Sequence, residues 1–363
     1  MGGAILVTGG AGYIGSHVVR QLGARGERVV VLDDLSSGRK DAVLYGDLVV
    51  GDVGERDLVA DLLRRHGVRE VIHLAARTVV PESVTNPIAY YRHNTLATHR
   101  LLEACARAGV RRFLFSSTAA VYGIPDAVPV AEDAPLRPIN PYGRSKVASE
   151  WMVRDLADTG ELAFGILRYF NVAGSDPAGR IGQSTPDPHL LIKVASQVAV
   201  GLRDHLAIYG TDFPTRDGTG VRDYIHVEDL ADAHLRTLDH LRAGGDSLTV
   251  NAGYGHGYSV REVVATLNGL LDAPLPVRES GRRPGDPPAL VARADRIREV
   301  LGWQPRYDDL AFIVQTALDW ERKLQTRQPG SRHEEARSRF GPAAGLHGRP
   351  FCPVLHPGDP RAG

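Results

Sequence analysis

Cysteine is scarce in this chain of 363 residues, and neither sign of charge is in excess. Only Cys105 and Cys352 are present, which give no disulfide framework and no closely spaced pair for a metal ion. The 43 Lys and Arg residues balance 43 Asp and Glu residues, so no net basic field attracts nucleic acid or an anionic membrane. We therefore expect no metal, no nucleic-acid partner and no membrane partner, and a cytoplasmic location.

Long hydrophobic runs are also missing. No window approaches the roughly 18 uninterrupted apolar residues of a membrane span. Residues 1–3 lead directly into the apolar stretch 4–7, without the charged segment of a signal peptide, so we expect the fold to begin there. With 43% hydrophobic residues, the chain can still bury a large core.

Up to about residue 170, short β-branched runs alternate with longer amphipathic stretches. This alternation predicts an α/β fold, a doubly wound parallel (Rossmann) sheet with helices on both faces. The expected strands are 4–8, 28–33, 47–51, 70–75, 111–117 and 163–169, and the expected helices are 13–25, 55–66, 88–109 and 142–158.

The second part of the chain has a different character. Loops rich in Pro and Gly, such as 176–179 and 282–288, interrupt short helices and strands. We expect one domain over residues 1–172, to which some later segments return, and a smaller loop-rich α/β lobe over 173–324 shaped around a ligand. Residues 325–363, rich in Arg, Gly, Pro and His, predict a weakly ordered tail.

A glycine-rich turn joins the first expected strand to the first expected helix. In Gly9-Gly10-Ala11-Gly12-Tyr13-Ile14-Gly15, the glycines let the backbone and the helix N-terminus approach a pyrophosphate. The next strand ends in Asp33, where a carboxylate can hold an adenosine ribose and repel a 2′-phosphate. The pattern predicts NAD rather than NADP, with Asp34 as an alternative partner and a turn that binds nothing as the plain alternative.

Two further turns follow strands at the same edge of the predicted sheet. Asp52-Val53 follows the third strand, and Ala75 follows the fourth. Ligands of open α/β sheets collect at the carboxyl ends of the strands, so these residues are candidates for cofactor contacts. Taken individually, both segments are more often ordinary turns.

The strand 111–117 brings Ser116 and Thr118 to this edge, and a Tyr-x-x-x-Lys pair follows. Tyr142 and Lys146 share one helix face because they are four residues apart. A free tyrosine has a pKa near 10 and needs help to act as a base. We predict that Lys146 and a positive nicotinamide ring favour the phenolate of Tyr142, and that Thr118 contacts the substrate oxygen.

These residues lie in segments that resemble a known family. From residue 4 to about 322 the chain resembles the extended short-chain dehydrogenases/reductases and, within them, the UDP-galactose (UDP-glucose) 4-epimerases. The similar segments are 7–17, 115–123, 140–146, 167–171 and, most specific, 208–227.

The resemblance implies an NAD-dependent isomerase that interconverts UDP-galactose and UDP-glucose through a 4-keto intermediate, with NAD held tightly. It implies that Tyr142 is the base, that Lys146 binds the nicotinamide ribose, and that Thr118 contacts the sugar. The implied cofactor contacts include Asn94 and Tyr169 besides Gly9, Gly12, Tyr13, Ile14, Gly15, Asp33, Asp52, Val53, Ala75 and Ser116. The implied contacts to uridine and diphosphate are Asn171, Leu190, Tyr209, Arg222, Arg283 and Asp286. Residues 1–172 then form the NAD-binding domain and 173–324 mainly the UDP-sugar lobe. A homodimer through helices 88–109 and 142–158 is expected.

Two positions depart from the family pattern. Thr78 stands where many relatives carry a lysine near the cofactor pyrophosphate, and Arg77 replaces that charge only if its loop turns suitably. Leu290 occupies the position where side-chain size influences acceptance of N-acetylated sugars. We expect UDP-galactose and UDP-glucose to be preferred.

Several alternatives stay open. A nucleotide-sugar 4,6-dehydratase shares the Tyr-Lys pair but places acidic residues directly after the threonine, where this chain has Ala119 and Ala120. Epimerases of UDP-GlcNAc, UDP-pentoses or UDP-uronic acids are nearer rivals, because they differ only around the sugar. A non-catalytic nucleotide-sensing protein on the same fold is a further alternative.

Overall fold

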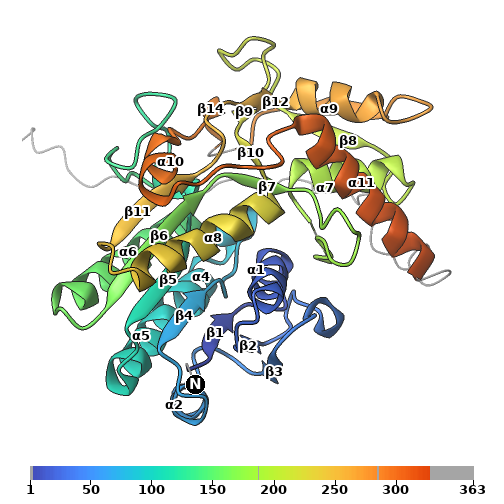
Figure 1. Cartoon of the computed structure of the whole chain (residues 1–363). Helices are drawn as coiled ribbons and strands as arrows, with labels where there is room; N and C mark the ends of the chain where they lie inside the picture. Colours follow the sequence, from blue (N-terminus) through green and yellow to red (C-terminus); the bar gives the residue numbers. More distant parts are fainter. Residues whose placement is uncertain (1–2, 187, 284–285, 328–363) are drawn as a thin grey trace, which may run out of the picture. The chain divides into compact units, whose positions relative to one another are not determined.

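Seven parallel strands form the central sheet of the computed structural model, which describes residues 3–186, 188–283 and 286–327. The strand order is β3-β2-β1-β4-β5-β6-β11, and the labels in Figure 1 follow this order across the sheet. The bounds are β1 Ile5–Thr8, β2 Val29–Asp33, β3 Asp47–Val50, β4 Glu70–His73, β5 Arg112–Thr118, β6 Ala163–Tyr169 and β11 Leu248–Ala252. The predicted doubly wound Rossmann class is confirmed, and the six predicted strands differ from these bounds by at most two residues.

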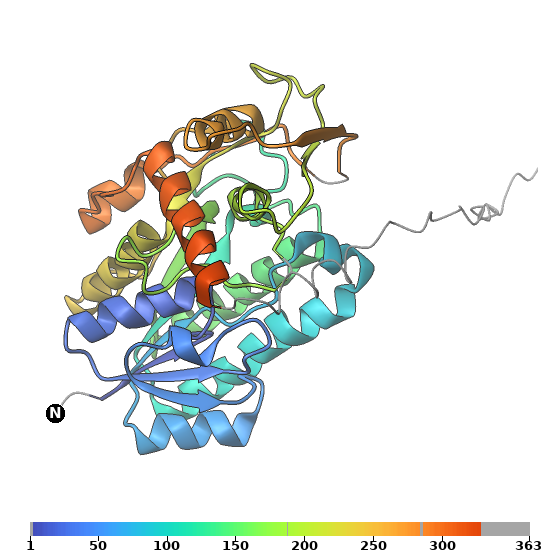
Figure 2. The same cartoon turned by 90° about the vertical axis from the view of Figure 1, so that its right-hand side faces the viewer.

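Helices cover both faces of the sheet because its strands are apolar on both sides. Ile5 and Val7 of β1 belong to one core, whereas Leu6 belongs to the other. The first core is covered by α1 (Tyr13–Ala24) and α8 (Val227–Arg242), which pack against each other. The second is covered by α2 (Arg56–Arg65), α5 (Ala97–Ala108) and α6 (Pro141–Asp158), and Figures 1 and 2 show the two helical layers.

The segment predicted as one helix over 88–109 is divided. It consists of α4 (Pro87–Tyr90), a π-helical turn η2 (Tyr91–Leu96) and α5, and it is preceded by α3 (Val80–Thr85). The wider turn surrounds Asn94, whose amide bonds to the backbone of the loop after β4. Tertiary hydrogen bonds therefore support the break, and π-turns of this kind often occur at functional sites.

The later part of the chain contributes to two regions. Strand β11 and helix α8 complete the central sheet and its cover. The other segments form three small sheets, β10-β7, β12-β9-β14 and β13-β8, with helices beside them in the upper part of Figure 1. Their bounds are β7 Asn171–Ala173, α7 Leu191–Ala199, β8 Leu206–Tyr209, β9 Val221–Arg222, β10 Tyr224–His226, β12 Tyr258–Ser259, α9 Val260–Asn268, β13 Val277–Ser280, β14 Ala289–Leu290, α10 Asp295–Leu301 and α11 Leu310–Arg327; two short 3-10 turns are η1 Lys40–Ala42 and η3 Ala119–Val121.

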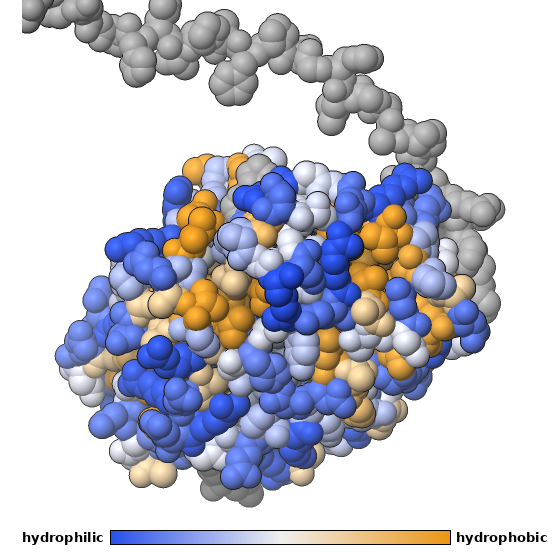
Figure 3. Space-filling view, turned by 90° about the horizontal axis from the view of Figure 1, so that it is seen from above, coloured by the Kyte–Doolittle hydropathy of each residue, from blue (hydrophilic) through white to orange (hydrophobic). Residues whose placement is uncertain are grey.

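The chain through Arg327 forms one compact unit. Of the predicted tail, residues 325–327 are the last turn of α11, and 328–363 lie outside the described residues, as does Cys352. Within the described part, no helix is both long enough and apolar enough to cross a membrane. Seen from above, its surface alternates between hydrophobic areas and strongly hydrophilic ones (Figure 3).

Candidate active site

The glycine-rich turn after β1 is a tight backbone cradle. Gly9 has a φ of +72°, and a Cβ there would lie 2.6 Å from the amide nitrogen of Ala75. A Cβ on Gly15 would lie 2.1 Å from the Gly9 carbonyl oxygen. Gly12 precedes α1 and no side chain caps that helix, so the amides of Tyr13, Ile14 and Gly15 in its first turn have no helical acceptor. These groups fit a cofactor pyrophosphate.

Asp33 braces this cradle from the end of β2. Its carboxylate accepts hydrogen bonds from the backbone amides of Ala11 at 2.9 Å and Leu35 at 2.8 Å. Burial raises the pKa of Asp33, and the two amide hydrogen bonds oppose that change. Asp34 instead bonds to Ser36 on the exposed side of the loop. Asp33 therefore orders the glycine-rich turn, and the choice between Asp33 and Asp34 as ribose partner stays a prediction.

The other predicted cofactor residues differ in their placement. Asp52 accepts a bond from the amide of Gly54 at 2.7 Å and so caps its own turn, and Val53 is buried beside it. Ala75 touches the glycine cradle. Asn94 holds the loop after β4, because its side chain accepts from Arg77 N and donates to Arg77 O, at 2.8 and 3.0 Å.

Tyr142 and Lys146 lie in the first two turns of α6. Asn140 caps this helix by accepting a hydrogen bond from the amide of Gly143 at 2.8 Å, and Pro141 occupies the first helical position, where its missing N–H costs nothing. Tyr142 and Lys146 are 5% and 2% exposed, so both polar groups are removed from bulk water.

Strand β5 supplies the partners of this pair. Lys146 Nζ donates to the Ser116 carbonyl oxygen at 2.9 Å and lies 4.7 Å from the centre of the Phe115 ring. The Thr118 side chain interacts with the Tyr142 hydroxyl and favours its ionised form. The structure thus brings Thr118, Tyr142 and Lys146 together at the carboxyl edge of the sheet.

Two buried histidines stand behind this group and were not foreseen. His234 Nδ1 lies 2.8 Å from the Leu230 carbonyl, so that nitrogen carries the proton and Nε2 accepts from Ser116 Oγ at 2.8 Å. His73 Nε2 lies 2.9 Å from Thr98 Oγ1, which donates to the Asn94 carbonyl. Both rings are neutral, because burial lowers the pKa of His234 to about 4 and that of His73 to about 3. No sequence motif marks either residue.

Burial dominates the protonation of the catalytic candidates. It raises the pKa of Tyr142 to about 12, with the Thr118 hydrogen bond opposing, and lowers the pKa of Lys146 to about 7, with the Glu150 charge opposing. In the chain by itself, desolvation of the phenolate has the larger effect, and the prediction that Lys146 together with a nicotinamide ring favours the phenolate stays a prediction. Burial likewise raises the pKa of Tyr169 at the end of β6, which interacts with Tyr142 and Ser116.

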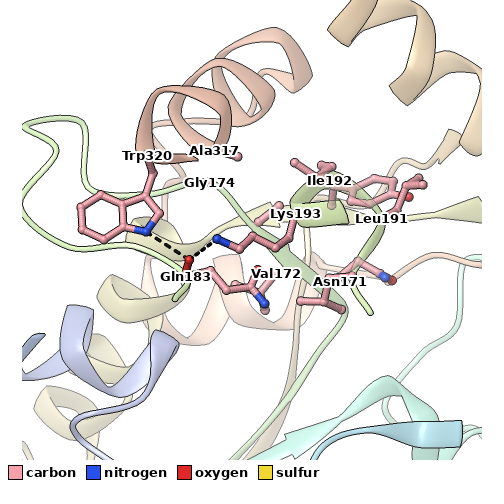
Figure 4. Close-up of a pocket in the computed structure, with 12 residues that line it drawn as sticks. Asn171, Val172, Gly174, Gln183, Leu191, Ile192, Lys193, Ala317 and Trp320 are labelled. Atoms are coloured by element: carbon pink, nitrogen blue, oxygen red, sulfur yellow. Dashed lines mark hydrogen bonds between the residues drawn. The ribbon is translucent and has the colours of Figure 1, made fainter. Parts of the chain in front are cut away.

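Asn171 and Leu190 line one pocket between β7, α7 and α11 (Figure 4). Its wall includes Lys193 and Trp320, and both side chains donate to the carbonyl of Gln183, at 2.5 and 3.1 Å. Lys193 also pairs with Glu321 of α11. Sequence reasoning did not identify Lys193, Trp320 or the further wall residue Tyr224. Of these three, only Tyr224 lies in a segment similar to the family, 208–227, where it follows Arg222 by two positions.

Four further predicted substrate residues lie on the small sheets and in the loop between β13 and β14. The Arg283 guanidinium lies 4.7 Å from the centre of the Tyr209 ring, and its Nε donates to Asp286 at 2.9 Å. Arg222, on β9, lies in the field of both Asp286 and Arg283, and burial lowers its pKa. Two guanidinium groups therefore lie near one carboxylate, an arrangement suited to a diphosphate.

The two departures from the family pattern have clear surroundings. The Arg77 guanidinium pairs with Glu82 at 2.9 Å, and both side chains are partly exposed. Leu290, 8% exposed, lies on β14 opposite Arg222 of β9 and packs into the core. Among the residues that the structure describes, no cluster of three or more His, Cys, Asp or Glu could hold a metal ion.

Comparisons with known proteins agree with this geometry. A profile of the NAD dependent epimerase/dehydratase family matches residues 5–253. The chain belongs to this epimerase family. It is 57% identical over 322 residues to a UDP-glucose 4-epimerase of Azospirillum brasilense, covering 88% of this chain and 92% of that protein.

Solved structures of similar epimerases superpose closely on this chain. The UDP-glucose 4-epimerase from Brucella ovis in complex with NAD gives a TM-score of 0.85 at 43% identity, with 88% of this chain and 98% of that chain covered. The UDP-glucose-4-epimerase from Stenotrophomonas maltophila, with bound NAD and formylated UDP-arabinopyranose, gives 0.87 at 38% identity, with 90% and 100% covered. The predicted family is thus confirmed.

Proposed function

We propose that this chain is an NAD-dependent UDP-glucose 4-epimerase that interconverts UDP-galactose and UDP-glucose through a 4-keto sugar. One observation carries the proposal: the buried Thr118, Tyr142 and Lys146 lie together at the carboxyl edge of the sheet in a chain similar to UDP-glucose 4-epimerases. The NAD in the two neighbouring structures supports the same cofactor here.

The glycine cradle, the first turn of α1 and Asp33 would hold NAD, as described above. When bound, NAD supplies reversible redox chemistry at C4 of the sugar and a positive ring charge. Tyr142 takes the proton of the C4 hydroxyl and later returns it. Thr118 interacts with the Tyr142 hydroxyl and orients it.

Lys146 supplies the local positive charge that favours the Tyr142 phenolate. Because burial lowers the pKa of Lys146 to about 7, its ammonium is only partly populated at neutral pH unless nearby negative charge supports it. Burial of Tyr142 also favours proton transfer, since a desolvated phenolate is a stronger base.

The UDP moiety is proposed to bind between the pocket that Asn171 and Leu190 line and the cluster of Tyr209, Arg222 and Arg283. Asn171, Leu190 and the aromatic ring of Tyr209 suit the uridine, while Arg222 and Arg283 suit the diphosphate. Anchoring through UDP leaves the hexose able to turn over, so that either face of the 4-keto sugar can be reduced. We assign residues 1–172 mainly to NAD and 173–324 mainly to the UDP-sugar.

Incubation of the purified chain with UDP-galactose, with NAD omitted and then supplied, tests the proposal. NMR of the products should show UDP-glucose, and the Tyr142→Phe variant should be inactive. Product without added NAD indicates retained cofactor. If neither condition yields product, UDP-pentoses, UDP-uronic acids and UDP-GlcNAc are tried next, and inactivity on all of them leaves the nucleotide-sensing alternative.

A homodimer through the helices over 88–109 and 142–158 (α6) is also proposed. Large apolar side chains are exposed on these mutually contacting elements, notably Ile88 at 74% and Trp151 at 59%, with Val84 and Leu96 nearby in the same bundle. Trp151→Glu should convert a dimer into monomers in sedimentation analysis. A cytoplasmic location is proposed from the paucity of cysteine and is checked by cell fractionation.

A further inference from the structure

Glu150 is a buried carboxylate on the same helix face as the catalytic candidates. It follows Lys146 by four residues and Tyr142 by eight on α6, and it is fully buried. Its two oxygens are saturated: Oε1 accepts from Ser117 Oγ at 2.5 Å and from Arg168 Nε at 3.0 Å, and Oε2 accepts from Arg168 Nη2 at 2.6 Å.

The partners of Glu150 belong to the two strands that carry the rest of the site. Ser117 separates Ser116 from Thr118 at the end of β5, and Arg168 directly precedes Tyr169 at the end of β6. One carboxylate thus joins the helix that carries Tyr142 and Lys146 to both of these strand ends.

Arg168 extends the connection further. Its Nη1 donates to Tyr122 Oη at 3.0 Å and to the Glu132 carbonyl at 2.9 Å, and Tyr122 donates to Asn251 of β11 at 2.7 Å. Arg168 is only 2% exposed. A buried ion pair of this kind is often no better for stability than apolar side chains of the same volume, so stability alone gives little reason for it.

The charge of Glu150 also acts on Lys146. Burial lowers the pKa of Lys146, and Glu150 is the group that opposes it. Among the other titratable groups around this pair, His73 on β4 and His234 on α8 are neutral imidazoles, and burial keeps Tyr142 and Tyr169 protonated. Two cations face the same carboxylate: Arg168 pairs with Glu150 Oε2 at 2.6 Å, and the partly exposed Arg154 of α6 lies 3.9 Å from that oxygen.

We propose that Glu150 is a positioning residue for the epimerisation, which aligns α6 with the ends of β5 and β6 through Ser117 and Arg168 and supplies the negative charge that Lys146 requires. The proposal rests on the epimerase function proposed above. Glu150 touches neither reacting atom, so its effect must appear through Lys146 and Thr118.

Glu150→Gln tests the proposal, since it keeps the size of the side chain and an acceptor for Ser117. The kcat for UDP-galactose should fall about tenfold at pH 8.5 and much less at pH 6.5, because loss of the Glu150 charge lowers the pKa of Lys146 and its ammonium is then lost at a lower pH. The KM should stay within about twofold. An unchanged pH profile would overturn the proposal.

Tyr122→Phe is the matched control. It removes a buried hydrogen bond from the same network but leaves the Glu150 carboxylate in place. A structural role predicts comparable losses of thermal stability and activity in both variants, whereas the positioning role predicts that only Glu150→Gln moves the high-pH limb. Equal shifts in the two variants would contradict the proposal.

Ser117→Ala covers the case in which Glu150→Gln does not fold. It removes only the link between β5 and the carboxylate and leaves the ion pair intact. The kcat should fall about fivefold at unchanged KM and with retained NAD, and an unchanged kcat would refute the alignment. Inactivity of the parent protein would instead refute the epimerase function, and the two failures are thereby distinguished.

Discussion

The two halves of the candidate site differ in how deeply their polar side chains are buried. At the edge of the central sheet, Tyr142, Lys146 and Thr118 are at most 8% exposed and bond to buried neighbours. In the small sheets and the loop between β13 and β14, Tyr209 is 41% exposed and the Arg283 side chain 43%, beside the more buried Arg222. The first arrangement suits proton transfer, because burial is what moves a pKa by several units. The second suits capture of a charged ligand, because exposed cations can reach it.

This contrast predicts different kinetic consequences in the two halves. Substitutions at the buried group should act on turnover, since its interactions matter when the proton moves. Substitutions at the exposed group should act on substrate binding, since its contacts are equal in ground and transition states. The following experiments test that division.

Lys146→Met should have the largest effect. Without the ammonium the Tyr142 phenolate loses its positive neighbour, and we expect kcat to fall about 10²- to 10³-fold. Initial rates with UDP-galactose, at matched NAD content, measure this. Lys323→Met is the control, because Lys323 belongs to α11 and its ammonium donates to the Gly179 carbonyl. A Lys146→Met rate within threefold of the parent would remove Lys146 from the chemistry.

The Glu228→Gln variant tests how much a buried charge outside the catalytic group contributes to the stability of the fold. Burial would raise the pKa of Glu228, but hydrogen bonds from His17 and Gln21 and the charge of Arg20 outweigh it and lower the pKa to about 2. A carboxyl with a depressed pKa stabilises the fold at pH values above its unfolded pKa of 4.5. This contribution disappears as the pH falls towards 2, the pKa in the folded chain.

The variant should therefore lose about 3 kcal/mol of unfolding free energy at pH 7, with a difference that shrinks between pH 4.5 and pH 2. Urea unfolding at several pH values measures the loss. Asp239→Asn, on the exposed side of the same helix, should change little. A constant difference at all pH values would contradict the role of the charge.

Arg222→Met and Arg283→Met should raise KM and spare kcat. A lost charge-assisted hydrogen bond costs about 1.5–3 kcal/mol, so we expect KM to rise about 10- to 100-fold for each. UDP inhibition constants should rise in parallel, whereas Arg278→Met on the exposed strand β13 should leave both unchanged. A fall in kcat of similar size would erase the distinction between the two halves.

Arg261→Ala should have the smallest effect. Arg261 pairs with Glu279 at 2.5 Å, but both side chains are about half exposed, so solvent screens the pair. We expect a stability change below about 1 kcal/mol and normal kinetics. A larger loss in thermal unfolding would mean that exposed pairs on the small sheets contribute more than their burial suggests.

Most of the sheet could be predicted because its signals are local. The β-branched run Val29-Val30-Val31 predicts a buried strand from its own composition, and the glycines around Gly12 predict a tight turn after β1. The π-turn at Asn94 and strand β11 could not be predicted in the same way. The first depends on hydrogen bonds to Arg77, and the second on a pairing with β6 about 80 residues away in the chain.

The sequence by itself determined the fold class, the cofactor cradle and the Tyr142–Lys146 pair, because strand periodicity, glycine turns and helical spacing are properties of neighbours along the chain. Only the tertiary structure decided which charges are buried. It placed Glu150 against Arg168 and Ser117, turned Arg77 towards Glu82, and set Lys193 beside Asn171 in one pocket. These contacts join residues from different elements, and burial, which sets their pKa values, exists only once those elements have packed.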